Sequence, residues 1–323
     1  MKRRGLIAAL AGSAALALGL AACLAPWRER QVRLAIIDWP AYEYFYLASR
    51  KGLDREQGFT LQVDQFASLQ DQRRAFTRGD VDAIATTLPE AIAMCREVPA
   101  RCPVIVLVLD DSNGADQLIG PASLRSPAEL KGQRVGLERS VLGEFMLLSA
   151  VRPLGLTLAD FQLRYDNPKA LIAQLKRGAL DAVVTYVPHS DALLSDPRWR
   201  VLFSSSEIPG EVVDVLAVSP ELQRANQPLV AALVRTWWAS RQLAEQQPQQ
   251  SAALMAQRQG VTPAQFLLSQ RMIRYPDRAQ QAELLAPSGS VQRTLLRLQA
   301  QLRQANRLPQ GVPLPQVVSV QAP

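Results

Sequence analysis

The sequence predicts a two-part α/β protein in which each part is a largely parallel sheet flanked by helices. Short segments rich in Val, Ile and Ala alternate with helix-like segments, which is typical of sheets built through crossover helices. The stretch 78–89 also resembles the stretch 177–188, at an offset of 99 residues. Finally, 323 residues, of which 48% are hydrophobic and 20% charged, are enough for about two globular domains.

The internal repeat has a simple structural interpretation. In each copy a helix is expected to end at an Arg-Gly pair, at Gly79 and at Gly178, because glycine adopts the left-handed conformation that terminates helices. An Asp-Ala pair then starts a short apolar strand, which ends before Pro89 or Pro188. Because ligands of parallel sheets collect beyond the carboxyl ends of strands, the residues before these prolines are candidates for ligand contact.

The strands follow from apolar segments bounded by turn residues. In chain order they are 32–38, 60–66, 82–87, 104–110, 117–120, 134–138, 161–166, 182–186, 200–204 and 214–219. From Pro220 onward apolar residues recur at helical spacing, and further helices are expected at 263–272 and 290–305. The Pro-rich segment after Leu308 is expected to be loosely ordered.

The N-terminal segment has the features of an export signal. Lys2, Arg3 and Arg4 precede an apolar run that is too short to span a bilayer comfortably. The sequence Leu-Ala-Ala-Cys at 20–23 resembles the bacterial lipobox, whose cysteine is lipidated and becomes the first residue of the mature protein. We therefore expect a signal peptide at 1–22, a lipidated tether at 23–30 that begins with Cys23, and a location at the periplasmic face of a bacterial membrane. The alternative is an ordinary signal peptide or signal anchor with an incidental cysteine.

Cys95 and Cys102 would then lie in an oxidising compartment, where thiols tend to pair. The segment between them contains a proline and looks like a loop that a disulfide could close. Two buried reduced thiols are the alternative.

The composition excludes several classes of function. A single histidine, His189, cannot build a His-rich zinc site, and the sequence has no Cys-x-x-Cys pair, so no metal is expected. The sequence lacks a G-x-S-x-G nucleophile motif. The net charge is +7, but no run of five or six like charges occurs. We therefore expect neither an enzyme nor a nucleic-acid partner, and no cofactor.

Several motifs carry a resemblance to a known family. The segment 39–42 (Trp-Pro-Ala-Tyr) and the stretches 110–116, 130–136 and 208–216 are similar to parts of the nitrate/sulfonate/taurine-type solute-binding proteins of ABC importers. The resemblance implies a type II periplasmic-binding-protein fold with two α/β lobes joined by a hinge of two crossings. It implies a monomer that captures a small organic nitrogen- or sulfur-containing solute and delivers it to a permease and its ATPase.

The same resemblance implies how the chain is divided between the lobes. The expected units are lobe 1 at 31–116 and 213–308, lobe 2 at 117–212, and a tail at 309–323, with crossings near 115–118 and 211–214. A ligand-sensing accessory lipoprotein on this scaffold is the alternative function, and a pyrimidine-precursor-related enzyme is a further one.

The ligand is expected in the cleft between the lobes. The residues that the resemblance places there are Trp39, Tyr42, Ser68, Thr86, Thr87, Asp111, Ser112, Asn113, Glu138, Ser140, Tyr186 and Asp214. Trp39, Thr86 and Tyr186 in particular are expected to line one shared cavity. The structural alternatives are core packing for the aromatic residues, ordinary strand ends for the threonines and a helix cap for Ser140.

The acidic residues around this cleft bear on the ligand. They are Asp38, Asp111, Glu138 and Asp214. Carboxylates in a cleft of low dielectric constant repel a bare oxyanion, so a ligand with a cationic or hydrogen-donating part, such as an amine, an aminosulfonate or a pyrimidine, fits better. The alternative is that these acids pair with Arg139 or Arg134 and never meet the ligand.

Overall fold

The computed structural model describes residues 30–320, so Cys23, the expected signal peptide and most of the expected tether lie outside the described residues. Within residues 30–320 the strands form two sheets, of which the first has the order β11-β4-β10-β3-β1-β2 with β12 also paired to β4. Its strands are β1 (Gln31–Ile36), β2 (Thr60–Gln65), β3 (Ala83–Thr87), β4 (Val104–Ser112), β10 (Val213–Val218), β11 (Ile273–Arg274) and β12 (Gln316–Val317). The second sheet has the order β7-β6-β8-β5-β9. Its strands are β5 (Asp116–Pro121), β6 (Arg134–Leu137), β7 (Gln162–Tyr165), β8 (Ala182–Tyr186) and β9 (Trp199–Ser204).

The chain passes between the two sheets twice. The first passage takes only residues 113–115, between β4 and β5, and the second takes residues 205–212, between β9 and β10. The crossing expected at 115–118 therefore begins earlier, because residues 116–118 already pair in β5. Ser112, at the end of β4, and Ser205, at the start of the second crossing, are joined by a hydrogen bond of 2.8 Å between their hydroxyl oxygens.

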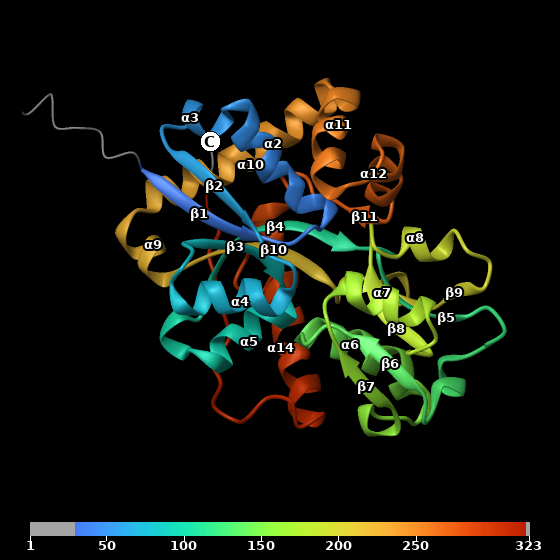
Figure 1. The fold of residues 1–323 in the computed structure, drawn as a ribbon. Helices are drawn as coiled ribbons and strands as arrows, with labels where there is room; N and C mark the ends of the chain where they lie inside the picture. The colour runs from blue at the N-terminus through green and yellow to red at the C-terminus, as the bar shows by residue number, and fades with distance from the viewer. Residues whose placement is uncertain (1–29, 321–323) are drawn as a thin grey trace, which may run out of the picture.

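Helices cover both faces of the first sheet, with α2 and α10 on one side and α4 and α5 on the other (Figure 1). The N-terminal and central helices are α2 (Glu43–Lys51), α3 (Leu53–Glu56), α4 (Leu69–Arg78), α5 (Leu88–Glu97), α6 (Val141–Val151), α7 (Pro168–Lys176) and α8 (Asp191–Leu194). The C-terminal helices are α9 (Pro220–Ala225), α10 (Gln227–Gln246), α11 (Pro248–Gln259), α12 (Pro263–Gln270), α13 (Gln281–Leu284) and α14 (Ser290–Gln304). Trp237 of α10 is fully buried against Phe45 of α2, with ring centroids 5.0 Å apart.

The internal repeat folds into the same local structure in both sheets. Gly79 and Gly178 each adopt a left-handed conformation, with φ of 84° and 76°. The aspartate of each copy accepts hydrogen bonds from the backbone and the guanidinium of an arginine in the neighbouring parallel strand. The backbone bonds are Arg33 N to Asp82 Oδ2 and Arg134 N to Asp181 Oδ2, both 2.9 Å. We call each of these arrangements an Arg–Asp clip.

The C-terminal segment is ordered, so the expectation of a loose tail is wrong. β12 pairs in parallel with the start of β4, and the Val318 N–H donates to the Ile105 carbonyl at 2.9 Å. The valines and the leucine of residues 312–320 pack against the main core. Apolar burial therefore orders a segment whose prolines suggested a loop.

The same edge of β4 is covered at two further points. β11 pairs with the end of β4 at Asp111 and Ser112. Between β11 and β12, the side-chain amide of Gln281 accepts a hydrogen bond from Val108 N (3.0 Å) and donates one to Val108 O (2.9 Å). Three separate pieces of the C-terminal region thus satisfy the outer edge of the longest strand.

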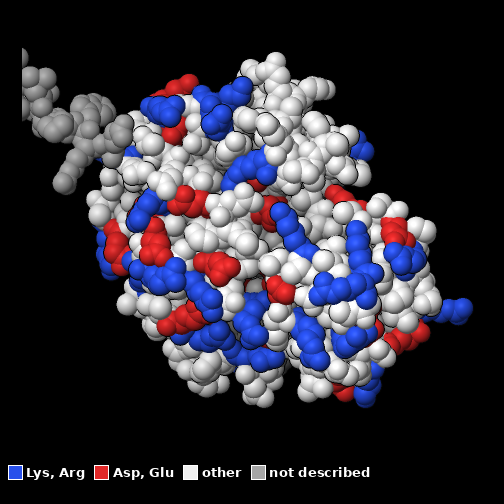
Figure 2. Space-filling view, viewed as in Figure 1, with Lys and Arg blue, Asp and Glu red and all other residues white. Residues whose placement is uncertain are grey.

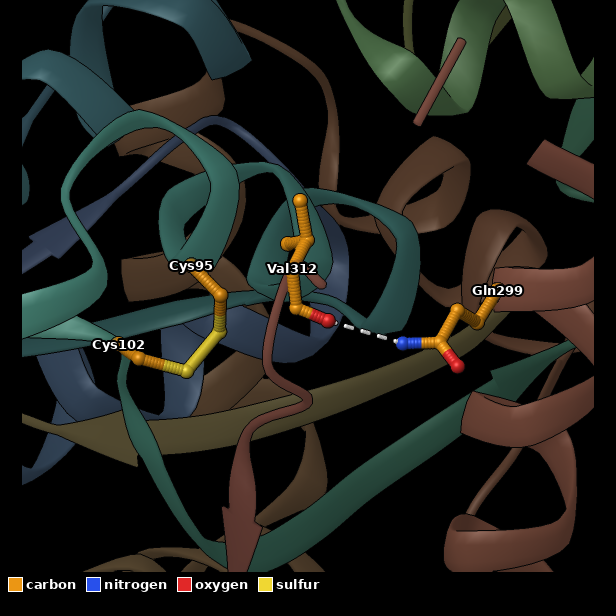
Figure 3. Close-up of a disulfide and its surroundings, with 4 residues drawn as sticks. All are labelled: Cys95, Cys102, Gln299 and Val312. Carbon is orange, nitrogen blue, oxygen red and sulfur yellow. Dashed lines mark hydrogen bonds between the residues drawn. A yellow bond between two sulfur atoms is a disulfide. The ribbon is translucent and has the colours of Figure 1, made fainter. Parts of the chain in front are cut away.

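Cys95, fully buried in α5, and Cys102, just before β4, are joined in a disulfide (Figure 3). Beside it, Gln299 of α14 donates a hydrogen bond to the Val312 carbonyl at 3.1 Å. The disulfide closes the short turn between α5 and β4, and the neighbouring bond ties the C-terminal segment to α14.

Charged side chains of both signs are interspersed on the face shown in Figure 2. Within the part of the chain that the structure describes, no helix has the length and apolar character needed to cross a membrane. In that same part, no group of three or more His, Cys, Asp or Glu side chains is arranged to hold a metal ion.

Candidate ligand-binding cleft

A small cavity lies between the two sheets, beyond the ends of β1, β3 and β8. It is lined by Ile37, Trp39, Tyr42, Leu69, Thr87, Asp116, Leu142, Tyr186 and Asp214, and we call it the inner cavity. The free volume of this cavity is only about 10 Å³. This is room for about one water, so an organic solute can enter only when the two sides of the cavity separate.

Aromatic side chains from both sheets meet in the inner cavity. Trp39 follows β1, and its ring centroid lies 5.9 Å from that of Tyr186, at the end of β8, in an edge-to-face arrangement. Tyr42 lies on the other side of Trp39, with centroids 6.5 Å apart. Such rings provide apolar walls with polar edges, which is a common way to build a small-molecule site.

Four buried carboxyl groups belong to the inner cavity or to the residues that contact its lining. Asp116 and Asp214 line the cavity, whereas Asp110 and Glu138 bond its lining residues Trp39 and Leu69. The indole N–H of Trp39 donates to Asp110 Oδ2 at 3.2 Å, and the Tyr42 hydroxyl donates to Asp214 Oδ1. Among residues 30–320, none of the four forms an ion pair with Lys, Arg or His.

Burial raises the pKa values of all four groups. The pKa of Asp110 and that of Asp116 rise to about 7, and the pKa of Glu138 rises to about 8. The pKa of Asp214 is raised well above its usual range by burial and then by the adjacent charge of Asp110, its partner across the β4–β10 ladder. A carboxyl group that leaves water without a counter-charge favours its protonated form.

The arginines that could have neutralised the cleft acids are engaged elsewhere. Arg134 bonds Asp181 in the second Arg–Asp clip, and the Arg139 guanidinium lies over the ring of Tyr165, 4.3 Å from its centroid. The alternative that these arginines pair with the acids is therefore wrong.

Two helices begin at the edge of the inner cavity, and glutamates already occupy their N-termini. The N–H groups of Val141 and Leu142, at the start of α6, donate to Glu90 Oε1 at 2.5 Å and 3.0 Å. Leu69 N, at the start of α4, donates to Glu138 Oε1 at 3.3 Å. Each contact crosses the cleft, because Glu90 belongs to the layers of the first sheet and Glu138 follows β6 of the second.

Glu90 is itself held from its own side. It is fully buried and forms an ion pair with Arg73 of α4, whose Nε also bonds Glu97 at 2.9 Å. The Glu90 carboxylate therefore joins a buried cation of one half to a helix N-terminus of the other half.

A second space, the outer pocket, lies beside the inner cavity and offers about 360 Å³. It is lined by Asp38, Gln65, Phe66, Ala67, Asn167, Pro168, Lys169, His189 and Arg258. Tyr186, which lines the inner cavity, donates its hydroxyl proton to Asp38 Oδ1 of the outer pocket at 3.3 Å, so this contact joins the walls of the two spaces. His189 Nε2 lies 2.9 Å from Asp38 Oδ2. Burial alone raises the pKa of Asp38, but the hydrogen bond and charge of His189 outweigh burial and leave that pKa lowered.

The residues expected from the sequence divide into two groups. Trp39, Tyr42, Thr87, Tyr186 and Asp214 line the inner cavity. Ser68, Thr86, Asp111, Ser112, Asn113, Glu138 and Ser140 are not among its lining residues.

Thr86 and Asp111 lie elsewhere because adjacent residues of a strand face opposite sides of the sheet. Thr87 takes the place in the cavity that was expected for Thr86. Asp111 points away from the cavity, accepts a hydrogen bond from Gly210 N at 3.2 Å and lies 4.0 Å from Arg274, while its neighbour Asp110 reaches Trp39.

The remaining residues support the cleft indirectly. The Ser68 hydroxyl accepts a hydrogen bond from Asp71 N and caps α4, and the Ser140 hydroxyl accepts one from Gly143 N and caps α6. Glu138 accepts a hydrogen bond from Leu69 N at the start of α4. Ser112 is the last residue of β4, and Asn113 begins the first crossing, where its N–H donates to the Met272 carbonyl at 2.8 Å.

Four lining residues were not expected from the sequence, which are Ile37, Leu69, Asp116 and Leu142, and neither was Asp110, which bonds Trp39. Ile37 and Asp116 stand beside predicted strand ends, so their position was a usable signal. Leu69 and Leu142 follow Ser68 and Ser140, and recognising those serines as helix caps would have placed both leucines at the cleft.

Comparisons with known proteins agree with this architecture. The sequence profile of the NMT1-like family matches residues 25–259. The taurine-binding periplasmic protein of Escherichia coli (strain K12) is 24% identical over 186 residues, which are 56% of this chain and 57% of that protein. The chain thus spans little more than half the length of this relative.

Solved structures resemble nearly the whole chain. The alkanesulfonate-binding protein SsuA from Xanthomonas axonopodis pv. citri, bound to MOPS, superimposes with a TM-score of 0.74 at 19% identity, over 88% of this chain and 96% of that chain. The periplasmic nitrate-binding protein NrtA from Synechocystis PCC 6803 gives 0.71 at 13% identity, over 88% and 83%. At these identities the likeness establishes a periplasmic-binding-protein fold.

Proposed function

The chain belongs to the NMT1-like family, and we propose that it is the lipid-anchored solute-binding component of an ABC importer. It captures a small organic nitrogen- or sulfur-containing solute in the inner cavity and delivers it to a permease and its ATPase. It binds this solute without chemical conversion, at the periplasmic face of the membrane and as a monomer. The parts built on the two sheets act as lobes that close on the solute.

One observation carries this proposal. Aromatic and carboxyl side chains from both sheets converge on a single cavity, and the chain crosses between the sheets twice beside it. Two crossings form a hinge, and a hinge beside a shared cavity is the arrangement that opens and closes around a ligand. The relatives named above are described as binding proteins for taurine, alkanesulfonate or nitrate, which supports binding rather than catalysis.

Solute binding is tested on the full-length chain purified in detergent. Small molecules that co-purify are identified by mass spectrometry after denaturation, and each is added back in a thermal unfolding assay. A true ligand raises the unfolding temperature in a saturable way and is recovered unchanged. Trp39→Ala is expected to abolish the shift, whereas the control Trp199→Ala, on the edge strand β9, retains it. Failure of every small molecule to bind, or formation of a product, would overturn the proposal.

Lipid anchoring and transport are tested in cells. Cys23→Ala is expected to release the protein from the membrane fraction and to remove its lipid label. Uptake of the identified solute is expected to fall when the chain is deleted. Binding without any effect on uptake would instead indicate the sensor function.

A further inference from the structure

We propose that the solute of the inner cavity is a small organic cation: an ammonium-type head group held by Asp110, Asp116 and Asp214, with an apolar body against the aromatic walls. This inference rests on the proposed function and names the chemical class of the solute.

The carboxyl groups have no internal counter-charge. Asp110 and Asp214 are cross-strand neighbours on β4 and β10, and Asp116 lines the cavity beside them. Asp110 is completely buried and shares a hydrogen bond with Asp214, and neither carboxyl group has a cationic partner among residues 30–320. Adjacent buried carboxyl groups hold their protons when no cation is near, and a bound cation would allow them to ionise.

The donors that an anionic solute would need are already used. A helix N-terminus is the usual backbone site for sulfonate, carboxylate or phosphate groups. At the inner cavity, however, the first N–H groups of α6 bind Glu90 and the first N–H group of α4 binds Glu138. A solute anion would have to displace a buried glutamate and then face the remaining carboxyl groups.

The cations near the cleft are likewise paired or lie outside it. Arg73 is engaged by Glu90 and Glu97, His189 by Asp38, and Arg258 by Glu43 at 3.2 Å. Lys169 has no ion pair among the described residues, but it lines the outer pocket, beyond the contact between Tyr186 and Asp38. The positive charge of the molecule therefore does not reach the inner cavity.

The other walls fit an apolar body with a charged end. Ile37, Leu69 and Leu142 contribute aliphatic surface, and the rings of Trp39 and Tyr186 are suited to contact with a cation. A neutral polar solute would supply no charge to stabilise the ionised carboxyl groups, whereas an organic ammonium ion matches both the acidic and the apolar walls.

The experiment compares probes of equal size and opposite charge on the full-length chain in detergent. Butylamine is paired with butanesulfonate, and benzylamine with benzenesulfonate, in titration calorimetry and thermal unfolding at constant ionic strength. We expect the amine of at least one pair to bind at least tenfold more tightly than its sulfonate. Equal or tighter binding of the sulfonates would overturn the inference.

Two variants locate the effect. Asp214→Asn keeps the shape and an oxygen acceptor for the Tyr42 hydroxyl but removes the group that can ionise against a bound cation, and it should weaken amine binding at least tenfold. Asp196→Asn, on the surface with Arg198, is the matched control and should leave binding unchanged. If Asp214→Asn does not fold, Asp116→Asn serves the same purpose. Unchanged amine affinity in a folded cavity variant contradicts the inference.

The outcomes also separate this inference from the proposed function. Binding of a neutral or anionic co-purified solute, with no binding of either amine, overturns the cation preference and leaves the solute-binding function standing. Binding of no small molecule of any charge overturns the proposed function itself.

Discussion

Glu90 and His189 occupy equivalent positions in the two copies of the internal repeat, each directly after the proline that follows the strand. Both side chains reach across to the other half of the molecule. Glu90 reaches the N-terminus of α6, whereas His189 reaches Asp38 after β1. Glu90 is fully buried and also pairs with Arg73, but His189 lines the outer pocket. Equivalent positions of the repeat therefore each make a contact across the cleft. Because Glu90 is the more deeply buried of the two, we expect its contact to contribute more to stability.

Thr87 and Tyr186, which lie two residues before these prolines, also occupy equivalent positions of the repeat. Both line the inner cavity. Since the duplicated scaffold fixes where a strand ends, its two copies can carry different chemistry at matching places. The following predictions test how far this equivalence extends.

The largest expected effect is that of Glu90→Ala. Removing this carboxylate leaves the Arg73 guanidinium buried beside Glu97 alone and leaves the N-terminus of α6 without its acceptor. We expect a loss of ~3–5 kcal/mol in the free energy of unfolding, measured by urea denaturation. Glu97→Ala, which removes the more exposed partner of Arg73, should cost less. A Glu90→Ala cost no larger than that of His189→Ala would contradict the ranking of the two contacts.

The second prediction concerns pH. Asp110 and Asp116 have pKa values of about 7 and Glu138 one of about 8 in the folded chain, against ~4 when unfolded. The native state therefore binds more protons than the unfolded state between about pH 4 and pH 8, so stability falls as pH rises through this window.

We expect the unfolding free energy to drop by ~2 kcal/mol or more from pH 5 to pH 8, followed by thermal and urea unfolding. Asp38 has the opposite sign: its lowered pKa gives stability that is present above ~4 and is lost as pH falls through its folded value. Asp116→Asn should flatten the decline at high pH and leave the acidic side unchanged. A profile without any decline would refute the raised pKa values.

The third prediction concerns the other cross-cleft contact. His189→Gln should cost only ~1 kcal/mol, because the contact with Asp38 borders an open pocket. The pKa of Asp38 should rise, since the charge and hydrogen bond of His189 hold it down. An NMR titration of the Asp38 carboxyl carbon measures this rise. An unchanged Asp38 pKa would mean that His189 exerts no electrostatic influence across the cleft.

The smallest effects are expected for the two Arg–Asp clips. Their side chains are 27–39% exposed, so solvent screens each pair and each should contribute little to stability. Double-mutant cycles on Arg33 with Asp82 and on Arg134 with Asp181 should give small coupling energies that are equal within the error of the measurement. Unequal values would show that the repeat conserves geometry without conserving energetics.

Much of the fold could be predicted because its strands are short apolar segments between turn residues. The predicted strand at 182–186 coincides with β8, and the one at 60–66 exceeds β2 by a single residue. The tail was misjudged because its prolines suggested disorder, whereas its apolar side chains pack on the core next to β12. Local sequence patterns thus predict strands and helices well, but they do not predict which segment packs against a distant part of the chain.

The cavity was less predictable for a geometric reason. Sequence position identifies the end of a strand but not which of two adjacent residues faces inward. The β4–β10 ladder shifts register between Asp214 and Val215, so the orientation of Asp110 and Asp111 depends on an irregularity that no local pattern encodes. The contact of Glu90 with α6 depends in addition on how the two sheets sit against each other.

The side chain of Gln281 has a consequence for the solubility of the molecule. Its amide occupies the stretch of the β4 edge that neither β11 nor β12 reaches. An uncovered edge of such an apolar strand is a template on which another chain can add a strand. By pairing with the N–H and the carbonyl of Val108, this single amide group keeps that part of the edge from pairing with another chain. Gln281→Leu, which keeps the bulk and removes the amide, is expected to leave the buried N–H and carbonyl of Val108 without partners and to increase self-association, measured by light scattering as the concentration rises.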